Sequence, residues 1–366
     1  MTNWPTVPLG TAVELAYGKS LPKSIRSKGG SIPVYGSNGV TGWHSDALVN
    51  EPTVIVGRKG SAGAVQYVDR PCYPIDTTYF VRPRDGFAFD TRFLFYLLGW
   101  LDLSRLRTAT GVPGLTREDA YRESIPVPPM SEQQRIVDLL ARAEGIVRLR
   151  GEAQKKAAEM IPAIFIDMFG DPATKPNSWP ISKFGEIGAL DRGKSRHRPR
   201  DAAALYGGPY PFIQTGDVAN SGGRIRRHTA TYSGFGLAQS KLWRAGTLCI
   251  TIAANIAKTG VLEFDACFPD SVVGFVPGDR VRVGYVQAWL GFLQPTLEAN
   301  APQAAQKNIN LEILRALPIP VPPIDQQDAF VDRCERVLSI ERQQAAALAS
   351  SQAAFDALLA RVFSEN

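Results

Sequence analysis

The 366-residue sequence predicts an α+β fold with a pseudo-twofold internal repeat, in which two tandem loop-rich domains are joined by two long helices that form an antiparallel coiled coil. The first observation is a repeat: Ile125–Pro129 reads IPVPP and returns 194 residues later as Ile319–Pro323. The second is that each copy opens a long run of helical periodicity. A period near half of the chain indicates a duplicated domain pair, whereas solenoids repeat roughly every 20–50 residues.

The repeat extends well beyond these prolines. Further residues coincide at the same offset within the helical runs, and others recur upstream at an offset of 175. Only the loops between them differ in length, which is what a duplication followed by divergence produces. The clearest pairs are Gln133 and Gln327, Gly18-Lys19-Ser20 and Gly193-Lys194-Ser195, and Cys72-Tyr73-Pro74 and Cys267-Phe268-Pro269.

Each globular half reads as α+β. Short β-type runs such as Thr53–Val56 alternate with glycine turns in the first 85 residues. Residues 89–103 and 283–293 are typical of helices, one in each half. We therefore expect a first globular domain at 1–124, a central helical repeat at 125–175, a second globular domain at 176–318 and a C-terminal helical repeat at 319–366.

The proline-rich segments mark the helix starts. They predict stiff extended spacers, because proline has no backbone N–H to donate and disfavours helical conformation in the residue before it. Ser131 with Gln134 predicts a capping box at the first helix. Asp325 and Asp328 predict an acidic N-cap and first turn at the second. The first helix is expected to kink at Pro162 and end before Gly170.

Apolar residues in the two helical runs, 131–169 and 326–363, recur in alternating steps of three and four, as in a coiled-coil seam. About 38 helical residues span roughly 57 Å, too far to be covered by one small domain. We expect the two copies to pair. The alternative is that each helix folds back on its own domain or pairs with another chain. The predicted seam comprises Val137, Leu140, Val147, Ile161, Phe165, Val331, Leu338, Leu348, Phe355 and Leu359.

The composition limits the class of protein. With 44% hydrophobic residues the chain can form about two cored domains. Its four cysteines include no CxxC pair and its three histidines are scattered, so we expect no disulfide framework and no metal site. No basic-then-apolar leader precedes Trp4 and no apolar run approaches the roughly 20 residues of a membrane span, so a cytoplasmic protein is expected.

The basic charge is duplicated along with the fold. The net charge of +6 divides into +3 for residues 1–175 (21 basic, 18 acidic) and +3 for 176–366 (20 basic, 17 acidic). Such mild basicity is compatible with a polyanionic partner, although many other proteins share it.

One motif suggests a nucleotide site but has the wrong context. Gly188–Ser195 reads GALDRGKS and matches the phosphate-binding pattern GxxxxGK[ST]. Such a loop needs a buried strand before it and a helix N-terminus after it. Here Lys183–Glu186 precedes and Arg196–Arg200 follows, which is poor helix-starting material. We expect a turn that presents basic residues rather than an ATP site.

Other catalytic signatures are missing. No GxSxG, HExxH or kinase pattern occurs. Pro269-Asp270 offers the first half of a nuclease motif, but no [DE]xK follows it. No glycine-rich methyl-donor motif or Asn-Pro-Pro-aromatic tetrapeptide appears. We expect a non-catalytic chain with no catalytic residues.

The remaining chemistry is binding chemistry on loops. Arginine and lysine suit phosphates and guanine edges, while asparagine and glutamine suit adenine edges. The alternative for any one cluster is an ordinary solvated surface loop. The candidate DNA-binding residues are Lys19, Arg58, Lys59, Lys194, Arg196, Arg198, Arg226, Lys258, Gln306, Lys307 and Asn308, with Arg58 and Gln306 expected to read bases.

The sequence resembles the specificity subunit of Type I restriction-modification systems. The segments that carry the resemblance are IPVPPMSEQQRIV (125–137), MFGDP (168–172), TGVPGL (110–115) and AQKNIN (305–310). The combination covers nearly the whole chain. The recognition loops diverge in this family, so the candidate DNA-binding residues rest on residue chemistry alone.

The resemblance implies two target recognition domains, each reading one half of a split site in double-stranded DNA. It further implies that the helices set the half-site spacing and dock two methyltransferase subunits, which accompany restriction subunits. S-adenosylmethionine, ATP and Mg would then belong to the partners. Outward-facing Arg142, Arg148, Arg336 and Arg342 are expected to be available to them. The alternatives are the specificity chain of a related bipartite restriction-modification or defence system, a coiled-coil scaffold for proteins, and an enzyme with a cryptic site.

Overall fold

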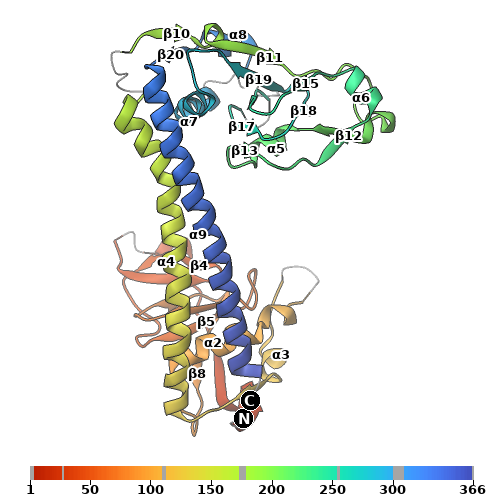
Figure 1. The fold of residues 1–366 in the computed structure, drawn as a ribbon. Helices are drawn as coiled ribbons and strands as arrows, with labels where there is room; N and C mark the ends of the chain where they lie inside the picture. Colours follow the sequence, from red (N-terminus) through yellow and green to blue (C-terminus); the bar gives the residue numbers. More distant parts are fainter. Residues whose placement is uncertain are drawn as a thin grey trace. The chain divides into compact units, whose positions relative to one another are not determined.

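A computed structural model of the chain describes residues 4–26, 29–108, 113–172, 179–253, 256–299 and 309–364. The chain divides into two units, Met1–Glu152 with Ala345–Asn366, and Ala153–Gln344. We call them unit 1 and unit 2. Each contains one globular domain together with a segment of both long helices (Figure 1).

Unit 1 is built on a four-stranded antiparallel sheet in the order β2-β8-β5-β6 and a three-stranded sheet in the order β4-β3-β7. Strand β5 is buried along its whole length, because its residues are Thr-Val-Ile-Val-Gly. The strands are β2 (Val13–Tyr17), β3 (Ile32–Gly36), β4 (Gly39–His44), β5 (Thr53–Gly57), β6 (Val65–Val68), β7 (Tyr73–Pro74) and β8 (Thr78–Pro83).

Unit 2 repeats this plan with a five-stranded sheet, β11-β19-β16-β17-β13, and a four-stranded sheet, β14-β12-β18-β15. The strands are β11 (Gly188–Arg192), β12 (Tyr206–Phe212), β13 (Arg224–Ile225), β14 (Ala230–Tyr232), β15 (Leu242–Trp243), β16 (Leu248–Thr251), β17 (Thr259–Leu262), β18 (Ala266–Cys267) and β19 (Val272–Pro277).

The two units share one backbone framework. The order β2-β8-β5-β6 corresponds to β11-β19-β16-β17, and Tyr17 faces Tyr79 where Arg192 faces Val273. Hydrogen bonds outside the strands correspond as well: Leu115 N–H donates to the Arg58 carbonyl, as Ile309 N–H does to that of Ile252. This correspondence confirms the internal repeat expected from the sequence.

Each half contains the helix that the sequence predicts, and this helix packs on strands of the larger sheet. α2 (Thr91–Leu101) starts two residues inside the expected range, because the Asp90 carboxylate caps the N–H groups of Arg92 and Phe93 at 2.8 and 3.0 Å. α7 (Val283–Ala299) runs further than expected and carries Pro295 inside it. The shorter helices are α1 (Leu9–Ala12), α3 (Arg117–Tyr121), α5 (Thr215–Ala219), α6 (Gly234–Ala238) and α8 (Leu311–Ala316), with 3-10 turns at Lys23–Ile25, Leu103–Leu106, Phe184–Glu186 and Ala203–Leu205.

The proline segments are extended, as expected, but they are paired strands rather than spacers. β9 (Ser124–Pro126) pairs with β1 (Thr6–Pro8), and β20 (Pro318–Pro320) pairs with β10 (Ile181–Lys183). Proline is tolerated because each pair is a two-stranded ladder with open edges. The ladders tie the first strand of each domain to the start of its long helix.

The long helices are α4 (Met130–Phe169) and α9 (Ile324–Ser364). The expected capping box is wrong, because α4 begins one residue before Ser131, and the carbonyl of Pro129 accepts hydrogen bonds from the N–H groups of Glu132 and Gln133. The end is as expected: Gly170 takes a positive φ of 81° just after the last helical residue.

The acidic start of α9 is only partly as expected. Asp325 lies in the first turn, but the helix already begins at Ile324, so it is not the N-cap. Asp328 forms an ion pair with Arg282, at 2.5 Å between its Oδ1 and Nε. This pair links α9 to the residue just before α7.

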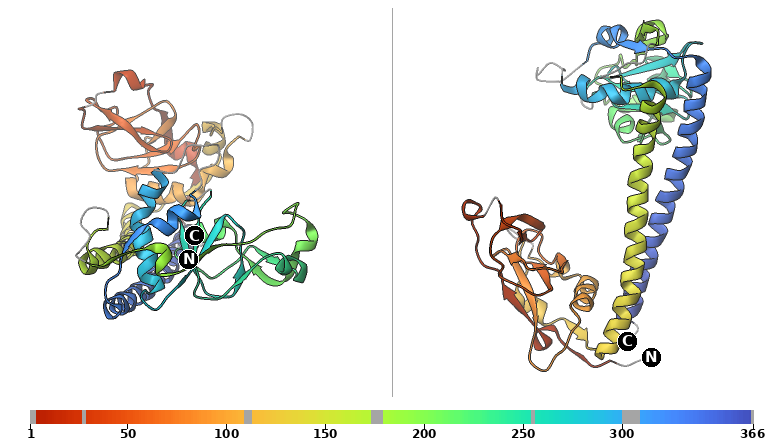
Figure 2. Two further views of the ribbon diagram at one scale, coloured as in Figure 1. Left: turned by 90° about the horizontal axis from the view of Figure 1, so that it is seen from above. Right: turned by 90° about the vertical axis from the view of Figure 1, so that its left-hand side faces the viewer.

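The helices pack together within each unit. In unit 1, Ile136 and Leu140 near the start of α4 share a core with Phe363 near the end of α9. In unit 2, Phe165 near the end of α4 shares a core with Phe330 near the start of α9. The segments lie side by side in perpendicular views (Figures 1 and 2). The predicted antiparallel pairing is confirmed, and each domain core also packs on the pair.

The predicted seam residues fall into two groups. Most are in a unit core, whereas Val147, Leu338 and Leu348 are half-buried outside the two helix-containing cores. The core members are Val137, Leu140, Phe355 and Leu359 in unit 1, and Ile161, Phe165 and Val331 in unit 2.

Candidate nucleic-acid interface

The repeated Gly-Lys-Ser segments have a structural role. Gly18 N–H donates to the Thr78 carbonyl and Lys19 N–H to that of Pro74, both at 3.1 Å. A Cβ at Gly18 would come within 2.1 Å of the Ile75 carbonyl oxygen, so only glycine fits. Gly193 and Lys194 make the corresponding bonds to Val272 and Phe268 at 2.9 and 3.0 Å.

The phosphate-loop pattern at Gly188–Ser195 is therefore not a nucleotide cradle. Its first five residues form strand β11, and Lys194 N–H donates to the Phe268 carbonyl, one residue after β18. The next helical turn in the described part of the chain begins at Ala203, so no helix begins directly after the pattern. Lys194 is among its exposed residues, as Lys19 is in Gly18-Lys19-Ser20.

Unit 1 has a cationic hollow of about 260 Å³, which we call the first-domain hollow. The guanidinium carbons of Arg58 and Arg117 lie 4.9 and 4.4 Å from the centre of the Tyr17 ring. Contacts at this distance are cation-π interactions. The hollow is lined by Tyr17, Arg58, Lys59, Tyr79, Thr108, Gly114, Leu115, Thr116, Arg117 and Glu118.

The backbone around Arg58 holds it in place. Its N–H donates to the Thr77 carbonyl at 2.8 Å, and its Nη1 donates to the Asp76 carbonyl at 3.0 Å. Lys59 forms an antiparallel bridge with Gly114 and leaves its side chain exposed. The sequence-predicted residues Arg58 and Lys59 are thus together, with Lys19 two residues from Tyr17.

Tyr79 forms part of the hollow's floor. Burial raises the pKa of its hydroxyl to about 12, and this hydroxyl donates to the Leu115 carbonyl at 3.0 Å. Tyr79 therefore remains neutral at physiological pH and adds no negative charge near the arginines. Sequence reasoning missed Tyr17 and Arg117. The sequence signals that could have found them are the position of Tyr17 directly before Gly18 and that of Arg117 two residues after Leu115.

The equivalent place in unit 2 has different chemistry. The strand registers and loop hydrogen bonds align Tyr17 with Arg192, and Arg58 with Ile252. Thr116 and Asn310 are both helix N-caps, so Arg117 aligns with Leu311. One framework thus carries an aromatic-cation cluster in unit 1 and mainly aliphatic side chains in unit 2.

Unit 2 instead has an open hollow of about 620 Å³ beside β13, which we call the second-domain hollow. Arg226 lines it but is held by Glu263 through two contacts at 3.0 and 3.1 Å. The amides Gln214 and Asn220, which sequence reasoning missed, join Arg224 and Arg227 there. Such a mixture of amides and guanidiniums can donate to and accept from base edges.

The loop after β11 presents its cations unequally. Lys194 and Arg196 are exposed, and Arg196 N–H is fixed by the Gln239 side-chain oxygen at 2.5 Å. Arg198 is turned back, because its Nη1 donates to the carbonyls of Ser195 and His197 at 2.8 Å. Lys258 reaches the Gln294 side-chain oxygen at 3.3 Å. Gln306, Lys307 and Asn308 lie outside the described residues.

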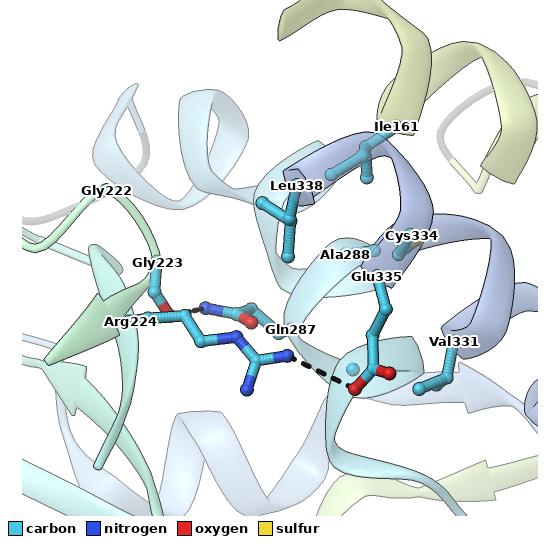
Figure 3. Close-up of a pocket in the computed structure, with 11 residues that line it drawn as sticks. Ile161, Gly222, Gly223, Arg224, Gln287, Ala288, Val331, Cys334, Glu335 and Leu338 are labelled. Carbon is cyan, nitrogen blue, oxygen red and sulfur yellow. Dashed lines mark hydrogen bonds and ion pairs between the residues drawn. The ribbon is translucent and has the colours of Figure 1, made fainter. Parts of the chain in front are cut away.

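A small cavity of about 170 Å³ lies where the second domain meets the long helices, within unit 2. Figure 3 shows Arg224 directed at Glu335, 3.7 Å away, and Gln287 beneath Gly223, whose carbonyl accepts its Nε2 hydrogen at 2.7 Å. Apolar Ile161 and Leu338 also line the cavity. This arrangement joins β13 to α7 and α9, which makes it a structural junction.

The described residues hold no group of three or more metal-ligating side chains. The cysteines are not activated, because burial raises the pKa of Cys72 and of Cys334 to about 11 and raises those of Cys249 and Cys267. No helix of the described chain could cross a membrane.

The fold defines a class of protein: a duplicated recognition scaffold with one framework, two sets of loops and a shared pair of helices. The chain belongs to the family of the Type I restriction modification DNA specificity domain, whose model matches residues 1–158 and 176–349. This confirms the resemblance inferred from the sequence.

Known relatives agree with this assignment. A Methanocaldococcus jannaschii protein assigned as the MjaX specificity subunit of a type I restriction enzyme is 22% identical over 236 residues, 60% of this chain and 54% of that protein. The chain thus matches about half the length of this relative.

Two solved structures share the fold over nearly the whole chain. The S subunit of a type I restriction-modification system from M. genitalium has a TM-score of 0.60 at 16% identity, covering 99% of this chain and 96% of that one. A chain solved in work on assembly and conformational transition of the type I R-M system has a TM-score of 0.64 at 20% identity, with 99% and 97% covered.

Proposed function

We propose that this chain is the DNA specificity subunit of a Type I restriction-modification complex, in which each domain reads one half of a bipartite site. The observation that carries the proposal is the pairing of one backbone framework with two different sets of side chains, Tyr17 and Arg58 in one unit against Arg192 and Ile252 in the other. Equal frameworks can approach DNA in the same way, while unequal side chains select different bases.

Contact with DNA needs cations that are not already neutralised. Arg58 and Lys59 meet this condition in the first-domain hollow, and Lys194 and Arg196 do so beside β11. None of these four occurs in an ion pair among the described residues. Arg226 and Arg200, by contrast, are engaged with Glu263 and Asp270. The unpaired cations are the stronger DNA contacts.

The helices set the spacing of the half-sites and dock two methyltransferase subunits, with restriction subunits joining them. Arg142, Arg336 and Arg342 are exposed on α4 and α9, and so is Arg148, although it pairs with Glu152 at 2.8 Å. Ile146 and Leu149 are 51% and 57% exposed on the same helix. Apolar and cationic side chains on one exposed helix suit a protein partner.

Catalysis belongs to these partners. S-adenosylmethionine, ATP and Mg bind in the methyltransferase and restriction subunits, while this chain supplies the sequence discrimination. The chain's contribution is the positioning of DNA bases relative to the partner's reacting groups.

The test is methyl transfer with and without the partner. The chain is incubated with a duplex library and labelled S-adenosylmethionine, alone and with its methyltransferase subunits. We expect sequence-specific methylation only when both are present. Methyl transfer by the chain alone would make it an enzyme. Equal site-specific methylation by the methyltransferase without this chain would remove its role, and failure of the assembly to bind any duplex would favour a protein scaffold.

A further inference from the structure

We propose that Tyr17 and Arg117, together with Arg58, form the base-reading element of the first domain and that this element reads a guanine edge. The inference rests on the proposed function and specifies it further. It assigns a role to two residues that sequence motifs do not mark, and it restricts that role to one half of the DNA site.

The geometry of the cluster is that of a prepared donor pair. The Tyr17 side chain is 46% exposed at the end of β2, and both guanidinium groups lie within 5 Å of its ring centre. Stacking on a ring limits the rotation of an arginine, so less side-chain entropy is lost on binding. Arg58 is restrained further by its bond to the Asp76 carbonyl.

The donors of these arginines are incompletely used. Arg117 Nε is buried and has no hydrogen-bond partner in the described structure. The ion pairs of the described chain do not include Arg117 or Arg58, although Glu118 also lines the hollow. The cluster therefore suits an acceptor that enters from solution.

Guanine presents two adjacent acceptors, O6 and N7, to the major groove, and a fixed arginine fork matches them. A phosphate also offers acceptors, but flexible lysines are sufficient to bind it. Exposed Lys59 borders the same hollow and Lys19 lies two residues from Tyr17. In this arrangement the lysines contact the phosphates and the stacked arginines read the base.

The second domain cannot recognise guanine in the same way. Arg192, Ile252 and Leu311 occupy the places of Tyr17, Arg58 and Arg117. The aromatic platform and both stacked cations are therefore missing from the equivalent site. Guanine recognition of this kind is confined to the half-site that the first domain reads.

The experiment uses the assembled methyltransferase complex and duplexes randomised in one half-site at a time. Arg117→Ala, Tyr17→Ala and Arg117→Lys are compared with the natural chain, and methylated sequences are read by sequencing. We expect Arg117→Ala and Tyr17→Ala to reduce discrimination for guanine at one position of the first half-site about 10- to 100-fold. Arg117→Lys keeps the charge but not the fork, so we expect it not to restore discrimination.

Arg82→Ala is the matched control, since Arg82 also stacks on a ring, that of Phe80 at 4.6 Å, but lies outside the hollow. We expect its sequence preference to equal that of the natural chain. Unchanged preference in the second half-site shows that each variant is folded, and Arg117→Gln replaces any variant that fails this criterion.

Two results would overturn the inference while leaving the proposed function intact. One is an equal loss on all sequences that Arg117→Lys restores, which is the behaviour of a phosphate contact. The other is an unchanged preference in every variant. If the natural complex itself methylates without sequence preference, the proposed function fails before the variants are compared.

Discussion

The side-chain oxygen of Gln133 accepts a hydrogen bond from the backbone N–H of Asp90 at 2.8 Å. Its Nε2 donates to the carbonyls of Ala88 and Pro128, each at 3.0 Å. In the second copy, Gln327 accepts from Arg282 N–H at 2.8 Å and donates to the carbonyls of Arg280 and Pro322. One buried amide thus connects each long helix to the segment before the domain's own helix.

We expect Gln133→Leu to lower the free energy of unfolding by about 1–3 kcal/mol, because it leaves a buried N–H and two buried carbonyls without partners. Gln134→Leu is the control, since Gln134 is exposed on the next position of α4. Urea unfolding measures both changes. An equal loss of stability in the two variants would mean that the buried amide contributes nothing particular.

Helix pairing gives a prediction about the core. Leu140 is fully buried in unit 1, so we expect Leu140→Ala to cost about 2–5 kcal/mol through lost burial and the cavity left behind. Leu149, 57% exposed on the same helix, should tolerate alanine with little change. Half-buried Leu348 should lie between them. Thermal unfolding of the three variants ranks them, and a different order would contradict the packing described.

Salt dependence separates free cations from paired ones. Lys194 is exposed, so Lys194→Ala should lower the slope of log binding constant against log salt by about one. Arg226 is held by Glu263 in two contacts, so Arg226→Ala should change the slope less. Titration of the assembled complex with duplex DNA at several salt concentrations measures both. Equal slopes in Lys194→Ala and the natural chain would place Lys194 away from the phosphates.

The buried thiol of Cys334 predicts that the stability of the fold decreases at alkaline pH. Burial raises the pKa of the Cys334 thiol from 9.0 to about 11, so the folded chain retains a proton that the unfolded chain releases. The stability that this thiol contributes is complete below pH 9 and is lost as the pH rises towards 11. We expect the free energy of unfolding of the Cys334→Ala variant, measured by urea unfolding, to decrease less steeply with pH over that window. A slope identical to that of the natural chain would exclude a contribution from Cys334.

Modularity can be tested by exchange. Replacing residues 176–305 with the corresponding part of a relative should change one half of the methylated sequence and leave the other unchanged, because the two units have separate cores. Genome-wide mapping of methylated bases reads both halves. A change in both halves, or in neither, would contradict independent reading.

Much of the fold could be predicted from the sequence because its determinants are local. Heptad spacing placed the long helices within two residues of their observed ends, and Gly170 marked the end of α4. The N-cap of α4 could not be predicted, because the Pro129 carbonyl competes with Ser131 for the first N–H groups. The pairing of the proline segments with residues 6–8 and 181–183 depends on contacts over more than 100 positions, which local patterns do not encode.

Some residues of the candidate site could also be predicted from the sequence, and others could not. Arg58 and Lys59 could be selected by type and by their position between glycines. Arg117 could not, because it is 100 residues from Tyr17 and meets it only through tertiary contacts. Arg226 matched a basic run in the sequence, but its neutralising partner Glu263 lies on another segment.

The sequence by itself determined the duplication, the two helices and the basic character of the loops, since each depends on residues close in the chain or on direct self-comparison. Only the tertiary structure decided which of those residues meet. Strand register puts Tyr17 opposite Tyr79 and Arg192 opposite Val273, and the turns at strand ends bring Arg58 and Arg117 to one ring. Such contacts form because burial of the surrounding core selects one register among many, and that selection acts on the whole domain at once.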